Sequence, residues 1–135
     1  MRLRDWQSRL QALFAERESM PLAWGTNDCC IFACDAVLAM TGEDPAAGLR
    51  EHRNEVEAAE LLTLHGGVLE LADARLGERI RPALAQVGDV GLVDTPLGPG
   101  LAVWGGSQWL GPGANGLVRL PFEAARVAWR GECHS

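Results

Sequence analysis

The chain has 135 residues, a formal net charge of −6, 47% hydrophobic residues and 22% charged residues. This composition is ordinary for a globular protein, and the length suits a single domain, which we expect to span residues 1–135. The negative charge, with no Lys/Arg cluster among the aromatic residues, argues against nucleic-acid binding. The longest apolar run, residues 29–40, is too short to span a bilayer. The charged start MRLRDWQSRL has no apolar core of a secretory signal, so we expect folding in a cytoplasm and no membrane partner.

The first half of the chain shows the patterns of two helices before residue 45. Apolar residues on one helical face, from Leu3 to Phe14, predict a first helix over about residues 3–17. The second runs from Cys29 to about Met40 and ends at Gly42, which is a typical helix stop. This second helix is apolar on every side, which predicts a central, buried position.

Two more helices are expected before the sheet. Asn54 caps a third helix that runs through Leu64 and ends before Gly66-Gly67. We expect its apolar residues to face the core: Val56, Leu61, Leu62 and Leu64. Residues 68–76 form a fourth helix, which Gly77 stops.

The pattern changes to short strands and turns after Pro82. We predict strands at residues 87–93, 101–104, 108–110 and 117–120, with a hairpin turn at Gly105-Gly106. Residues 111–116 are expected to be a loop. Pro121 then begins a short last helix, residues 122–129. Helices followed by a meander of strands indicate an α+β fold.

The stretch WGTNDCCIFACDAVLAM, residues 24–40, puts Cys29 at the start of the predicted second helix. A thiol there lies near the positive end of the helix dipole and near free backbone N–H groups, which favour the thiolate and lower the pKa of the thiol. Nucleophilic catalysis also needs a base, usually histidine, within hydrogen-bond reach. Cys29 is therefore the candidate nucleophile.

The pattern W-G-x-x-D-C-x-x-F, followed by a helix, a G-D-V strand and a small β-meander, resembles the NlpC-like cell-wall peptidases. The resemblance implies a papain-like fold, in which an antiparallel sheet packs on helices, with Cys29 as the nucleophile after Asp28. The strand that carries the catalytic histidine in that family corresponds to residues 99–105. The base position falls on Pro99 or Gly100, neither of which can accept a proton, and only Gln108 could serve as the third polar residue.

A second resemblance covers nearly the whole chain and is to a small family encoded among phage tail genes. The motifs that carry it are W-G-x-x-D-C-C, M-T-G-x-D-P-A, G-G, G-D-V, P-G-x-x-G-L and, with altered spacing, A-x-x-A-W-R. They occur in order at residues 24–30, 40–46, 66–67, 88–90, 112–117 and 125–130. This resemblance implies a tail-tip or baseplate component of a phage or prophage.

Another histidine could replace the missing base only if its imidazole lies within about 4 Å of the Cys29 sulfur. His52 lies in a charged stretch, where we expect it to be solvated. His65 ends the third helix, where a cation suits the helix C-terminus. His134 is next to the last residue, where chains usually fray.

Metal binding by the cysteines is a further alternative. Cys29, Cys30, Cys34 and Cys133 do not form the C-x-x-C knuckles of zinc sites. Cys30 and Cys34 share one helical face, and Cys34 is expected in the core. We therefore predict no metal and no cofactor, with a metal-carrying tail component as the alternative.

Three carboxylates are expected to have mainly structural roles. Asp28 caps the second helix, with a part in a catalytic site as the alternative. Asp35 lies within the apolar helix and needs an arginine partner, from the first helix or from residues 75–81. Asp89 is expected to bond to backbone in a turn.

The five Trp residues either fill the core or lie in an interface. Trp24 is expected to anchor the loop before the second helix. Trp104 and Trp109 flank the predicted hairpin turn, and we expect them to form a contact ridge.

Together the residues and resemblances predict an α+β domain of papain-like, NlpC-like type, with N-terminal helices followed by a small antiparallel β-meander. We expect a pseudoenzyme: a virion component of a phage tail tip or baseplate, assembled in the host cytoplasm, that docks to other tail proteins. The alternative is an active peptidoglycan endopeptidase, used during cell-wall penetration, with Cys29 as nucleophile.

Overall fold

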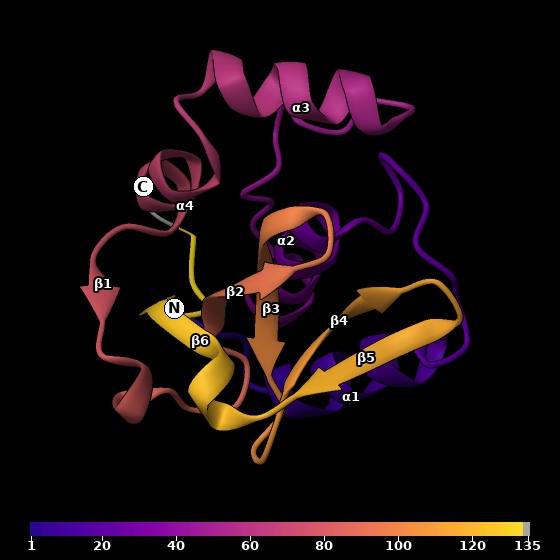
Figure 1. Ribbon diagram of the computed structural model, residues 1–135. Coiled ribbons are helices and arrows are strands. Elements are labelled where there is room, and N and C mark those ends of the chain that lie inside the picture. Colours follow the sequence, from indigo (N-terminus) through magenta and orange to yellow (C-terminus); the bar gives the residue numbers. More distant parts are fainter. Residues whose placement is uncertain (134–135) are drawn as a thin grey trace.

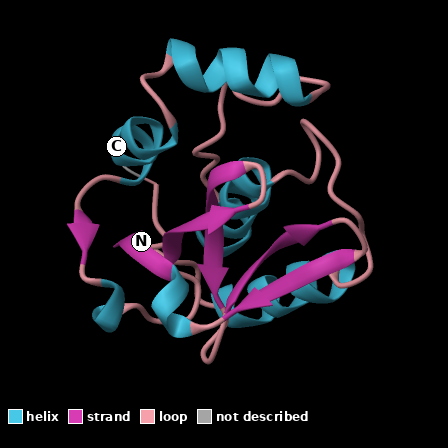
Figure 2. Cartoon of the chain, in the orientation of Figure 1, coloured by secondary structure: helices cyan, strands magenta, loops and turns pink. Residues whose placement is uncertain are grey.

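The computed structural model describes residues 1–133. Its helices are α1 (Trp6–Arg17), α2 (Cys29–Thr41), α3 (Glu55–Leu64) and α4 (Val68–Leu76). Its strands are β1 (Arg79–Ile80), β2 (Val90–Thr95), β3 (Gly98–Trp104), β4 (Trp109–Gly113), β5 (Gly116–Leu120) and β6 (Ala125–Trp129), with short 3-10 turns at Pro82–Leu84 and Phe122–Ala124. Helices precede the sheet, which confirms the predicted α+β class (Figure 1; Figure 2).

The strands form one antiparallel sheet in the order β1-β6-β2-β3-β4-β5. The last strand, β6, lies between β1 and β2, so the predicted helix over residues 122–129 is wrong beyond its first turn. Trp129 of β6 lies opposite Val90 on one side and Arg79 on the other. β2 pairs along most of β6, and β1 adds pairing at Ala128 and Trp129; the Val and Trp residues of β6 suit a pleated surface.

The predicted loop over residues 111–116 is confirmed only at the turn of residues 114–115; it is wrong elsewhere, because β4 continues to Gly113 and forms a hairpin with β5. Pro112 is tolerated in this strand, since the pairing of β4 with β3 ends at Leu110 and proline is accepted where no ladder hydrogen bond is needed. The opposite residue, Leu117, turns its N–H outward to the carbonyl of Glu18 at the end of α1.

Helix α2 lies at the centre of the fold, against β3 and α1 (Figure 1). Phe32, Val37 and Met40 on this helix are fully buried, as the apolar sequence predicts. Gly42 ends α2 in the left-handed conformation, with φ 80°, and its N–H bonds to the carbonyl of Leu38.

Helix α3 has the predicted bounds and the predicted Asn54 cap. The set of its side chains that face the core differs from the predicted set. Leu61 and Leu62 are half-buried against the core under α3. Val56 and Leu64 are exposed, so the prediction that all four apolar residues face the core is wrong for these two. Their spacing explains the difference, because positions 56 and 64 lie on a different side of a 3.6-residue helix from 61 and 62.

Asp89, at the entrance to β2, is fully buried and holds four partners. It accepts the backbone N–H groups of Gln86 and Gly131 at 2.8 and 2.9 Å. The turn interaction predicted for it is therefore confirmed. Its carboxylate also binds the guanidinium groups of Arg2 and Arg130, at 3.0 and 2.8 Å, two distant partners that no local sequence pattern indicates.

Within the described residues, none of the helices combines the length and the apolar character needed to cross a membrane.

Candidate functional site

Asp28 fixes the start of α2 and confirms the predicted N-cap. Its Oδ1 atom accepts the backbone N–H of Ile31 at 2.9 Å, and its Oδ2 atom accepts that of Gly25 at 2.9 Å. A second bond to Oδ2 comes from the Nε2 atom of His52, at 2.5 Å. Side chain and backbone groups thus surround this carboxylate, which is 2% exposed.

His52 was expected to be solvated, and that prediction is wrong. The residue is 8% exposed, and its second ring nitrogen, Nδ1, is buried and has no hydrogen-bond partner among residues 1–133. Its backbone lies directly over Gly25, where an added Cβ atom would lie within 2.1 Å of the His52 carbonyl oxygen. Only glycine permits this close approach. The glycine at position 25 thus lets the His52 backbone approach closely enough for the imidazole to reach Asp28.

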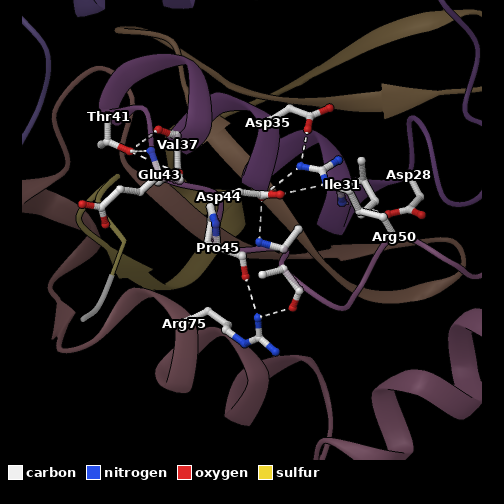
Figure 3. A network of polar contacts seen from close by, with 12 residues as sticks. Asp28, Ile31, Asp35, Val37, Thr41, Glu43, Asp44, Pro45, Arg50 and Arg75 are labelled. Carbon is white, nitrogen blue, oxygen red and sulfur yellow. Dashed lines mark hydrogen bonds and ion pairs between the residues drawn. The ribbon is translucent and has the colours of Figure 1, made fainter.

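A network of ion pairs holds the segment before His52 on α2 (Figure 3). Arg50 binds Asp35 at 2.7 Å and Asp44 at 3.0 Å. Arg17 of α1 binds the other oxygen of Asp35 at 2.7 Å, so the predicted partner from the first helix is confirmed. Arg75 binds backbone carbonyls of the 45–47 turn instead of Asp35. The network fixes Arg50 against the middle of α2, and His52, two residues later, reaches Asp28 at the helix start.

Cys29 faces strand β3, and Gly100 is the residue opposite its sulfur. A Cβ atom at Gly100 would lie 3.0 Å from Cys29 Sγ. Two positions correspond to the catalytic histidine of the peptidases. Gly100 is the one that faces the thiol, whereas Pro99 is exposed. The next residue, Leu101, directs its backbone N–H to the thiol.

No imidazole of residues 1–133 forms a hydrogen bond with the Cys29 sulfur. The Nε2 atom of His52 is hydrogen-bonded to Asp28, and its Nδ1 atom has no partner within the described residues. His65 caps the far end of α3. His134 lies outside the described residues.

The pKa of the Cys29 thiol is raised to about 11, which contradicts the lowered pKa expected at a helix start. Burial is the main cause, because it removes water from the thiolate. The backbone N–H of Leu101 opposes this rise, whereas the neighbouring Cys30 and the carboxylate of Asp28 add to it. Asp28 accepts the Ile31 N–H in the first turn of α2, so the positive end of the helix dipole is shared between this carboxylate and the thiol.

Two of the remaining cysteines are neighbours on α2. Cys30 packs against the cluster that contains Cys34, one turn further along α2. The neighbouring Cys34 thiol and burial raise the pKa of Cys30 well above its ordinary range. Cys34 is buried, as predicted. In the part of the chain that the structure describes, no three His, Cys, Asp or Glu side chains gather as a metal site would require.

The two Trp residues of the predicted ridge do not form one. Trp109 is fully buried, and its Nε1–H bonds to the carbonyl of Phe122 at 3.0 Å. Gly91 makes room for it, since a Cβ atom there would lie 2.7 Å from the indole ring. Trp104 is half-buried and packs on Trp109 with ring centroids 5.0 Å apart. Both therefore serve the packing of the sheet.

Trp24 and Gln108 lie in two different pockets. Trp24 is half-buried and lines a shallow pocket with Thr26 and residues 50–53. Gln108 is exposed in the β3–β4 turn and lines a cavity of about 340 Å³ with residues of α1 and Arg119 of β5. Cys29 lines neither pocket.

Residues 1–131 match a family described as a domain of unknown function, DUF6950. No curated protein matches the chain.

Proposed function

We propose that this chain, which belongs to the DUF6950 family, is a non-catalytic component of a phage or prophage tail tip or baseplate. It is built on a degenerate scaffold of papain-like, NlpC-like type and acts by docking to other tail proteins in the virion. The motifs shared with the tail-associated family, from residue 24 to residue 130, support the tail assignment. The geometry around Cys29 supports the absence of catalysis.

The observation that carries the proposal is that Gly100 lies directly opposite the Cys29 sulfur. A Cβ atom added at Gly100 would lie 3.0 Å from Cys29 Sγ. A cysteine peptidase needs a base at the thiol, and glycine has no side chain to supply one. With its pKa raised to about 11, the Cys29 thiol is ionised in only about one molecule in ten thousand at neutral pH. Within residues 1–133 no base is hydrogen-bonded to the thiol, and the raised pKa disfavours the thiolate; both support a non-catalytic role.

The rival is an active peptidoglycan endopeptidase with Cys29 as nucleophile. Cys29 does open a central helix beside an antiparallel strand, and the Asp28–His52 pair lies next to it in the fold. This rival requires an imidazole at the sulfur, whereas His52 directs Nε2 to Asp28. The available hydrogen bonds therefore favour the non-catalytic role.

The test is to delete the gene for this chain from the phage or prophage that encodes it. The deletion is then complemented with a gene for the wild-type protein or for the Cys29→Ala variant. We expect both to restore equal numbers of infectious particles, with the chain present in purified tails. Purified wild-type protein should release no muropeptides from cell-wall sacculi. Two results would contradict the proposal: muropeptide release that Cys29→Ala abolishes, or purified particles that lack the chain.

A further inference from the structure

Helix α3 has two apolar faces, and only one of them is covered. On the inner face Ala58, Leu61 and Leu62 contact the core. On the outer face Val56 is 66% exposed and Leu64 is 81% exposed. The helix lies at the edge of the molecule, at the opposite end from α1 (Figure 1).

The outer residues form one continuous surface, which we call the α3 stripe. Six residues line it: Glu55, Val56, Ala59, Glu60, Thr63 and Leu64. Their spacing of three and four residues is that of one helical face. A second apolar face on a short surface helix contributes nothing to the core of this chain, and contiguous apolar surface of this kind marks contact sites for other proteins.

The charge at the α3 stripe is negative. The sequence of α3, EVEAAELLTL, has three Glu and no Lys or Arg. Glu55 and Glu60 border the apolar residues, and neither takes part in an ion pair with any residue in 1–133. A second copy of this chain would bring glutamates against glutamates across such a contact, and like charges there disfavour association.

We propose that the α3 stripe docks a basic amphipathic segment of another protein, with apolar residues on the stripe and Arg or Lys side chains on Glu55 and Glu60. This is the mode in which an apolar helix face receives an amphipathic partner, while charges at the rim select it. The proposal rests on the docking role proposed above and identifies the surface and the partner chemistry.

The experiment that identifies the occupant is photo-crosslinking in cells that assemble the particles. A photoreactive phenylalanine analogue replaces Val56 or Leu64 in the full chain, and Leu97 serves as control because it is 58% exposed in the β2–β3 turn. We expect positions 56 and 64, and not 97, to crosslink to one protein, through a peptide that carries Arg or Lys beside apolar residues. Crosslinks to another copy of this chain, to an acidic peptide, or to nothing overturn the proposal.

The crosslinked peptide is then synthesised and titrated against purified variants. Leu64→Gln is expected to raise the Kd at least tenfold, whereas Leu97→Gln leaves it unchanged. Glu55→Gln with Glu60→Gln should weaken binding and reduce its salt dependence. Equal Kd values for all variants overturn the proposal. Unchanged melting temperatures verify that these exposed substitutions leave the fold intact.

Complementation separates this inference from the proposed function. If Leu64→Gln supports normal particles that contain the chain, the α3 stripe is not the docking surface, and the tail role stands. If wild-type particles lack the chain, the tail role itself fails, whatever the crosslinks show.

Discussion

His52 and Asp28 form a pair inside the protein, with Nε2 and Oδ2 2.5 Å apart and side chains that are 5% and 3% exposed. The pair joins the first turn of α2 to the segment that leads into α3. Asp28 also holds the Trp24-Gly25 turn through the N–H of Gly25. One carboxylate thus connects three segments at the start of the central helix.

Replacing His52 with Ala should lower the free energy of unfolding by about 2 kcal/mol, since a hydrogen bond to a charged group is worth about 1.5–3 kcal/mol. The buried Asp28 then loses one of its partners. Chemical denaturation measures the effect. His65→Ala is the control, because this half-exposed ring at the end of α3 is expected to change stability by less than about 0.5 kcal/mol. Equal losses for both variants would show that the Asp28 contact adds nothing.

The sequence predicted those parts of the fold that depend on local signals. The second helix follows from Asp28, an apolar run and Gly42, and Asp35 was assigned an arginine partner because a buried carboxylate requires one. His52 was missed, because its contact with Asp28 depends on a close approach of the chain over Gly25. No periodic pattern reports such a contact, and the charged neighbours of His52 are typical of a solvated stretch.

Long-range pairing explains the other errors. Residues 125–129 become a strand because β1 and β2 lie on either side of them, although Pro121 suggests a helix start. Trp109 was expected on the surface, but Gly91 on a strand two places away leaves space for its ring. The pKa of Cys29 was predicted in the wrong direction, because burial against β3 outweighs the helix dipole.

Alkylation by iodoacetamide should show that Cys29 is unreactive at neutral pH. A raised pKa keeps the thiol protonated, and only the thiolate reacts, so the rate should rise with pH until a midpoint near the pKa of about 11. Peptide mapping follows the Cys29 label, and Cys29→Ala identifies any signal from the other cysteines. Rapid labelling with a midpoint below about pH 8.5, the ordinary pKa of a free thiol, would instead favour the peptidase hypothesis.

Gly100→Ala should destabilise the protein by about 1–3 kcal/mol, the usual cost of overpacking. The new Cβ atom would lie 3.0 Å from Cys29 Sγ and 3.2 Å from the Cγ2 atom of Thr95. Gly111→Ala on the next strand is the matched control, since its nearest neighbour would be 3.8 Å away. Chemical denaturation should give a clearly smaller loss for this control.

Removal of the sulfur tests the cause of that loss. In a cycle with Cys29→Ala, the double variant should recover at least about 1 kcal/mol relative to the sum of the single variants, because residues in contact are not additive. Additive effects would mean that Gly100 is not positioned against the thiol. Such a result would remove the main observation against catalysis.

Asp89→Ala should be the most damaging of these substitutions. It removes a fully buried carboxylate that binds Arg2 and Arg130, and breaking a buried ion pair costs about 3–5 kcal/mol. Asp89→Asn should cost less, because the amide oxygen still accepts a backbone N–H. Both effects are measured by chemical denaturation.

The control for Asp89 is Asp94→Ala, which removes an ion pair with Arg126 at 2.9 Å between two exposed side chains. Exposed pairs contribute about 0–1 kcal/mol, so the loss should stay within that range. Asp89 is buried and Asp94 is exposed, and this difference would then explain why the two substitutions lower the free energy of unfolding by different amounts. A loss for Asp89→Ala as small as that for Asp94→Ala would mean that water replaces the carboxylate, and that Arg2 and Arg130 hold their segments on β2 without it.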